Sequence, residues 1–130
     1  MKKNILVLLI VFSTSCLYGQ MLEPQEGTNQ KWGFIDNTGN LVIPYKYDRA
    51  DGFIEGLAAV SINGKWGFID KNDSIVIPFK YTYIDGFSTT GFAMVNIDDK
   101  YGFIDRKGTE VVPLEYTKEE AIQKFKLLNK

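Results

Sequence analysis

Apolar and polar residues alternate in short runs along most of the chain, and this pattern predicts β-strands. Side chains of a strand point alternately to its two faces, so a half-buried strand shows a period of two. Two such runs flank Asn63-Gly64, a dipeptide that favours a two-residue type I′ hairpin because both positions need positive φ. The turn pairs Ser61 with Trp66 and Val60 with Gly67. We therefore expect an antiparallel hairpin at the centre of the chain.

The predicted hairpin has two apolar faces. Trp66 and Phe68 share one face, and Val60 and Ile69 share the other. Such a sheet cannot bury both faces alone, so neighbouring units must cover them. Gly67 leaves a gap beside Val60, where we expect another layer to approach closely.

A second turn follows the hairpin and begins with an aspartate. Asp36 and Asp105 each open a D-x-x-G sequence, and a type I turn favours Asp first and Gly fourth. In the copy that Asp70 opens, Asp73 replaces the glycine, and Asp tolerates the left-handed conformation moderately well. A β-branched run follows, and we expect Pro78 to end it because proline lacks the ladder donor. Each unit is thus predicted to be a three-stranded antiparallel meander.

These elements recur three times. The sequence K-W-G-F-I-D begins at Lys31 and Lys65, and K-Y-G-F-I-D begins at Lys100, so the offsets are 34 and 35 residues. Each copy is followed by a proline and, three residues later, a tyrosine. Repeats of this period indicate stacked supersecondary units. The repeated structural positions are Trp32, Gly33, Asp36, Trp66, Gly67, Asp70, Tyr101, Gly102 and Asp105.

The K-[WY]-G-F-I-D core with its downstream V-I-P-x-x-Y resembles the WG-repeat, or KWG-repeat, family of bacterial proteins. The resemblance covers Lys31 to about Tyr116, and Tyr101 replaces the tryptophan in the last copy. It implies a β-rich module of an exported or surface protein, and it brings no common activity, cofactor or substrate. We expect an all-β fold in which three-stranded meanders stack as a short array. An open fragment of a propeller-like ring is the alternative.

The last residues predict a helix. Thr117 and Glu120 form a capping box, and Ala121, Phe125 and Leu128 follow at helical spacing. We expect this helix to cover the exposed edge of the last repeat, and docking of a partner is the alternative. The predicted organisation is a signal peptide (1–19), a polar leader (20–30), three repeats over 31–116 (31–64, 65–99 and a partial 100–116), and a C-terminal helix (117–130).

The first residues resemble an export signal. Lys2 and Lys3 precede the apolar run Ile5 to Phe12, and small and polar residues follow. The run is too short to span a bilayer, which needs about 20 apolar residues. Cleavage after Gly19 is the first expectation, and lipidation of Cys16, which follows a loose lipobox, is the alternative. The protein is then periplasmic, at the cell surface or extracellular, with membrane attachment only through Cys16.

The composition argues against most chemistry. The chain has no histidine, its only cysteine is Cys16, and no glycine-rich phosphate loop precedes a helix. Loss of Lys2 and Lys3 lowers the formal net charge of −1 by two, which gives no basis for nucleic-acid binding. The repeated aspartates sit at predicted turns, and no acidic turn fits a calcium loop. We expect no enzyme activity, no cofactor and no metal site.

We expect a binding or structural module at the cell envelope, with another envelope or extracellular protein as partner. Carbohydrate binding through aromatic loop residues is the leading alternative, toxin neutralisation is another, and an enzyme with paired carboxylates ranks last. Trp32, Trp66 and Tyr101 are interpreted as core residues in preference to sugar contacts. Loop residues that break the repeat are better binding candidates, because the fold does not require them. These candidates are Tyr45, Lys46, Arg49, Phe79, Lys80 and Tyr83.

The first prediction concerns export. N-terminal sequencing of the protein purified from the cell envelope should begin at Gln20, because the signal is removed on export. A lipid on Cys16 would select the lipoprotein form. Recovery of intact Met1 from the cytosolic fraction would contradict export.

Overall fold

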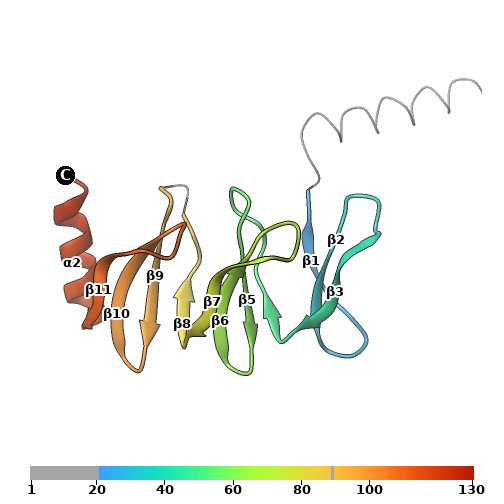
Figure 1. The fold of residues 1–130 in the computed structure, drawn as a ribbon, viewed down its shortest axis with the longest axis horizontal. Helices are drawn as coiled ribbons and strands as arrows, with labels where there is room; N and C mark the ends of the chain where they lie inside the picture. The colour runs from blue at the N-terminus through green and yellow to red at the C-terminus, as the bar shows by residue number, and fades with distance from the viewer. Residues whose placement is uncertain (1–20, 89) are drawn as a thin grey trace, which may run out of the picture.

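The computed structural model describes residues 21–88 and 90–130. Three antiparallel sheets stand side by side along the long axis, and a helix lies at one end of the row (Figure 1). The expected all-β repeat array with a C-terminal helix is therefore confirmed. The predicted signal peptide, with Cys16, lies outside the described residues.

The elements run in simple order along the chain. The first sheet has the order β1 (Glu23–Glu26), β2 (Trp32–Ile35) and β3 (Leu41–Tyr47). The second has β4 (Arg49–Ala50), β5 (Ala58–Ile62), β6 (Lys65–Ile69) and β7 (Ile75–Tyr81). The third has β8 (Tyr83–Asp85), β9 (Phe92–Ile97), β10 (Lys100–Asp105) and β11 (Glu110–Tyr116), and the helix α2 (Lys118–Leu128) follows.

The expectation of three strands per unit is wrong for two of the three sheets. The short strands β4 and β8 pair with β5 and β9 and make these sheets four-stranded. A strand of two or three residues is too short to show an alternating pattern. The predicted polar leader over 20–30 also contains a strand, β1, which pairs antiparallel with β2. Backbone pairing forms these strands without an apolar run in the sequence.

The central hairpin has the predicted register. Ser61 pairs with Trp66 and Val60 with Gly67, and the turn residues Asn63-Gly64 both have positive φ. The two faces of the sheet contribute to different cores. Phe68, 1% exposed, belongs to a core shared with the third sheet, and Val60, fully buried, belongs to a core shared with the first. The sheets are therefore stacked face to face, and each buries a face of the next.

The glycine of each repeat makes room for a strand of its own sheet, and not for another layer as we expected. A Cβ on Gly67 would lie 2.6 Å from the carbonyl oxygen of Ile77 and 3.0 Å from the amide nitrogen of Phe79. The equivalent distances to a carbonyl oxygen are 2.3 Å at Gly33 and 2.4 Å at Gly102. Any side chain at these positions would overlap backbone, which cannot move aside cheaply.

The backbone comes this close because β7 is bulged. Ile77 pairs with Phe68 and Tyr81 pairs with Trp66, so β7 has two more residues than β6 between these pairs. Pro78 lies in the bulge and does not end the strand, which corrects our expectation. Proline is tolerated there because β7 is an edge strand and loses no ladder bond. In every repeat the proline follows the glycine by 11 residues. The glycine and the bulge that holds the proline therefore act together, and we call this pair the glycine–bulge device.

The aspartate turns form as the sequence predicts. One carboxylate oxygen of Asp70 accepts backbone N–H bonds from Asn72 and Ser74, both at 2.9 Å. Asp36 and Asp105 accept the same pair of bonds in their own turns. The fourth residue of each turn has positive φ: Gly39, Asp73 and Gly108.

The helix α2 covers a face of the third sheet and not its edge, which corrects the expectation. The ring of Phe125 stacks on Phe103 with centroids 4.2 Å apart and contacts Phe92 edge-on at 5.2 Å. The capping box between Thr117 and Glu120 is present. The helix begins directly after β11, so it takes the place that a fourth sheet would occupy on this apolar face.

The opposite end of the array has a polar surface. Glu23 and Gln25 pair with Ile35 and Gly33 on the outer face of the first sheet. In the second sheet, the equivalent positions hold the buried Ala58 and Val60. A polar outer face is typical of a terminal capping repeat. The described array therefore has a polar face at one end and a helix over the other.

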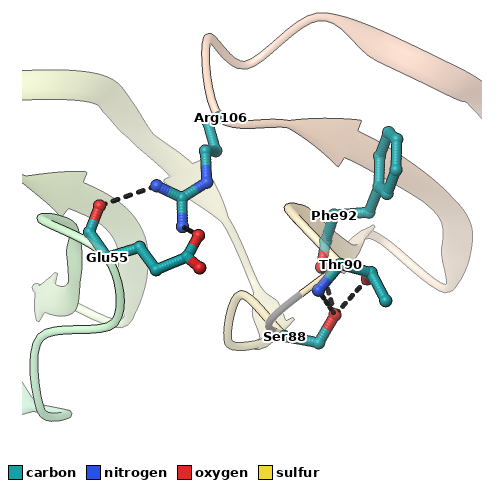
Figure 2. Close-up of polar contacts among 5 residues, drawn as sticks. All are labelled: Glu55, Ser88, Thr90, Phe92 and Arg106. Carbon is teal, nitrogen blue, oxygen red and sulfur yellow. Dashed lines mark hydrogen bonds and ion pairs between the residues drawn. The ribbon is translucent and has the colours of Figure 1, made fainter.

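Polar contacts also link the second and third sheets. Arg106, in the turn between β10 and β11, donates from Nη1 to the carbonyl oxygen of Glu55 at 2.7 Å and forms an ion pair with its carboxylate (Figure 2). Beside it, the hydroxyl of Ser88 accepts from the amide of Thr90 at 3.3 Å and donates to the carbonyl of Phe92 (Figure 2). The Arg106 contacts join the second sheet to the third, whereas the Ser88 contacts lie within the segment that precedes β9.

The second prediction tests the glycine–bulge device. Gly67→Ala should lower the free energy of unfolding by about 1–3 kcal/mol, because the added methyl group overlaps the bulged backbone. Gly86→Ala is the matched control, since a Cβ there has nothing within 4 Å, and it should change stability by less than about 0.5 kcal/mol. Urea unfolding measures both. Equal stability of the two variants would show that the close approach is not a constraint.

Candidate functional site

A groove of about 730 Å³ crosses all three sheets along the side that carries their first strands. The first sheet contributes two lining residues, and the second and third contribute the remainder. Because β1, β4 and β8 are edge strands, the stacked array leaves this side uncovered by further strands. The groove is lined by Glu26, Trp32, Asp48, Arg49, Ala50, Asp51, Trp66, Thr82, Tyr83 and Ile84.

Trp32 and Trp66 are both core residues and groove residues. Each is half-buried, and each pairs across its sheet with the repeat tyrosine, Tyr47 or Tyr81. Trp32 packs against the core between the first and second sheets, and Trp66 against the core between the second and third. Their remaining surface faces the groove. The third member of the set, Tyr101, is half-buried and does not line it.

The groove carries both charged and neutral polar groups. Asp48 forms an ion pair with Lys31 and accepts a hydrogen bond from the amide of Asn63 at 2.7 Å. The bond from Lys31 holds the pKa of Asp48 below its usual value. Asp51, by contrast, has no ion pair within the described part of the chain, and desolvation raises its pKa. The two carboxylates therefore differ: one is already neutralised by a cation, and the other is not.

Two of the six predicted binding residues lie in the groove. Arg49 and Tyr83 occupy equivalent positions in β4 and β8, where they pair with Ser61 and Asn96. The Tyr83 side chain is 44% exposed and is one of the large apolar side chains on the surface. The structure thus brings these two together with Trp66, from three separate strands.

Three other candidates make contacts that the fold explains. The ring of Phe79 stacks on Tyr47, with centroids 6.2 Å apart, and packs on the core between the first two sheets. Tyr45 lies against Gly27, where a Cβ would come within 2.6 Å of its ring. The amine of Lys80 lies 5.3 Å from the ring centroid of the neighbouring tyrosine. None of the three lines the groove.

Lys46, the sixth candidate, belongs to an inter-sheet contact. Its amine and the hydroxyl of Tyr47 both bind the carboxylate of Asp73, in the turn of the next sheet. Asp73 is the residue that replaces the turn glycine, so the departure from the repeat links two sheets. At the next interface the turn has Gly108, and the buried hydroxyl of Tyr81 has no hydrogen-bond partner among residues 21–88 and 90–130.

Sequence reasoning missed the groove residues beside Arg49 and Tyr83. Asp48 and Thr82 directly follow the repeat tyrosines and begin the next sheet, and Thr82 donates to the Asn96 side chain at 2.6 Å. The sequence D-G-F occurs at Asp51 and again at Asp85, but only the pairing of distant strands places Asp51 in the same groove as the indoles. A signal for Asp48, Asp51 and Thr82 was their place in the sequence, shortly after the repeat tyrosines. Each lies next to a short strand that the alternating pattern does not reveal.

The described residues hold no group of three or more carboxylate, histidine or cysteine side chains that is placed to bind a metal ion. The repeated aspartates Asp36, Asp70 and Asp105 lie in their turns and do not line the groove. Within residues 21–88 and 90–130, no helix has the length and apolar character needed to cross a membrane.

Comparison with known families gives one match. The model of the WG containing repeat matches residues 32–66, 66–101 and 101–121. No curated protein and no solved structure matches the chain. The first match covers β2 and β3 of one sheet and β4 and β5 of the next, so a sequence repeat spans a sheet–sheet interface and is not itself one sheet.

The third prediction tests the tyrosine–aspartate contact. Burial, followed by the hydrogen bond to Asp73, raises the pKa of Tyr47, so its hydroxyl stays protonated and donates. Tyr47→Phe should cost roughly 1.5–3 kcal/mol of stability, as expected for a hydrogen bond to a charged group. Tyr81→Phe is the matched control and should be neutral or stabilising, because its hydroxyl is buried without a hydrogen-bond partner among the described residues. Thermal unfolding that ranks the variants in the opposite order would contradict this account.

Proposed function

Because the chain belongs to the family of WG-containing repeat proteins, we propose that it is a non-enzymatic binding module of the bacterial cell envelope, with another envelope or extracellular protein as its partner. The observation that carries the proposal is the groove, which crosses all three sheets. Repeat arrays present extended surfaces of this kind for recognition.

The lining of the groove favours a protein partner. Tryptophan, tyrosine and arginine are the residue types that most often dominate the energy of protein–protein contacts. Trp32, Trp66, Tyr83 and Arg49 all line the groove. The two indoles are held by core packing, so they lose little conformational entropy when a partner binds. The groove is therefore preorganised for recognition.

The envelope location rests on the N-terminal sequence. Lys2 and Lys3 with the apolar run Ile5 to Phe12 have the order of an export signal. Lipidation of Cys16 is the form that would attach the module to a membrane. The assignment as a binding module and not an enzyme rests on the residue types available, since the sequence offers no histidine and no second cysteine.

Carbohydrate binding is the second candidate function. The observation that favours it is the pair of half-buried indoles, Trp32 and Trp66, at equivalent positions of consecutive sheets. The charged groups Arg49 and Asp51, which line the same groove, are less typical of a sugar-stacking platform than of a polar protein contact. We therefore rank this function second.

The fourth prediction tests the groove. The immobilised mature chain should capture a protein from envelope extract, and the Arg49→Ala/Tyr83→Ala double variant should reduce that capture at least about tenfold, a loss typical of interface anchors. Ile75→Ala and Leu127→Ala are controls, because both side chains are at least 60% exposed and lie off the groove. Equal capture by the double variant would contradict a groove function. A glycan-array signal that the double variant abolishes would establish the carbohydrate function in its place.

A further inference from the structure

Two aromatic residues of the groove lie at equivalent positions of consecutive sheets. Trp32 and Trp66 occupy the same position in consecutive sheets, each opposite the repeat tyrosine of its own sheet. Sheets stacked face to face lie about 10 Å apart. Face-to-face stacking at that general spacing would place the two indoles about 10 Å apart. Tyr83 of the third sheet adds a further aromatic ring to the lining.

One extended chain conformation has this period. A polyproline II helix has three residues per turn and a rise of about 3.1 Å, so every third side chain recurs after about 9 Å. In a β-strand the side chain returns to the same face after two residues, or roughly 7 Å, and this distance does not match the separation expected for the two indoles. Proline-rich segments in the polyproline II conformation dock into aromatic-lined grooves at low entropic cost.

We propose that the groove binds a proline-rich segment of the partner protein in the polyproline II conformation, with successive turns packed on Trp32 and Trp66. This inference rests on the proposed function and specifies its ligand. The backbone carbonyls of such a segment make no internal hydrogen bonds. Arg49 supplies donors to them from the groove wall, because a guanidinium group carries five N–H bonds and no acceptor.

The charges of the groove specify a basic residue in this segment. Glu26, Asp48 and Asp51 line the groove with Arg49 as the one cation of the lining. Lys31 already neutralises Asp48. Glu26 and Asp51 remain without an ion pair within the described part of the chain, so the wall favours a lysine or arginine of the ligand beside its prolines.

The occupant is a different chain. The protein has four prolines, and each is isolated within a strand of its own sheets: Pro24 in β1, Pro44 in β3, Pro78 in β7 and Pro113 in β11. Each of these four strands is paired with a neighbour in its sheet, so no proline belongs to a free segment. A second copy of this protein therefore offers no proline-rich segment to the groove.

The test is direct binding of peptides to the mature protein, measured by fluorescence anisotropy. The probes are labelled peptides of about twelve residues with proline at every third position and one arginine, varied at the remaining positions. Control peptides have the same compositions in an order that breaks the three-residue period. We expect the periodic set to contain binders and its shuffled controls to bind at least about tenfold more weakly.

The variants separate this inference from the proposed function. Tyr83→Ala should weaken peptide binding about tenfold, Asp51→Asn should weaken it and reduce its salt dependence, and Ile75→Ala should leave it unchanged. If the periodic and shuffled sets bind alike while the groove still captures an envelope protein, the polyproline ligand is wrong and the binding function stands. If Tyr83→Ala instead abolishes binding of a glycan, both proposals are overturned.

Discussion

The central sheet has two apolar faces, and it can bury them only between neighbours. Val60 faces the first sheet and Phe68 faces the third, and both are almost completely inaccessible to solvent. The rest of the architecture follows from this constraint. The third sheet also has an apolar outer face, which Phe125 of the C-terminal helix covers. The first sheet instead carries polar residues on its outer face. The two ends of the described array therefore differ, because the helix covers one and the other is polar.

Within each sheet, a local device sets the shape that makes stacking possible. The glycine after each repeat aromatic residue leaves space for the bulge that holds the repeat proline. The bulge also brings the repeat tyrosine opposite the aromatic residue, as Tyr81 lies opposite Trp66. The indole is thereby held between the core and the groove, so the same motif serves folding and leaves an aromatic surface for recognition.

Much of this fold was predictable from the sequence because its determinants are local. Asn63-Gly64 fixes the register of the central hairpin, and the aspartate turns need only residues within four positions of each other. The strands β4 and β8 were not predictable, because two or three residues show no periodicity. The role of Gly67 was misread because it depends on a bulge in a strand about ten residues further along the chain.

The groove was predictable only in part, for a related reason. Arg49 and Tyr83 were found because they break the repeat, but Phe79 also differs from its counterpart Tyr45 and packs on the neighbouring sheet. Lys46 recurs as Lys80 in the second copy and forms an ion pair with the next sheet. A departure from the repeat does not distinguish a contact between sheets from an exposed surface. That distinction requires the arrangement of the sheets, which brings lining residues as far apart in the sequence as Glu26 and Ile84 to one groove.

The face-to-face stacking of the sheets is the claim on which the groove, the caps and the ligand geometry all depend. Nuclear Overhauser effects between side chains test it most directly. The account predicts that the methyl groups of Val60 show contacts to core residues of the first sheet, such as Phe34 and Ile43, and that the Phe68 ring shows contacts to Val95 and Ile104 of the third. Contacts from Val60 and Phe68 to the same neighbouring sheet, or to neither, would contradict it.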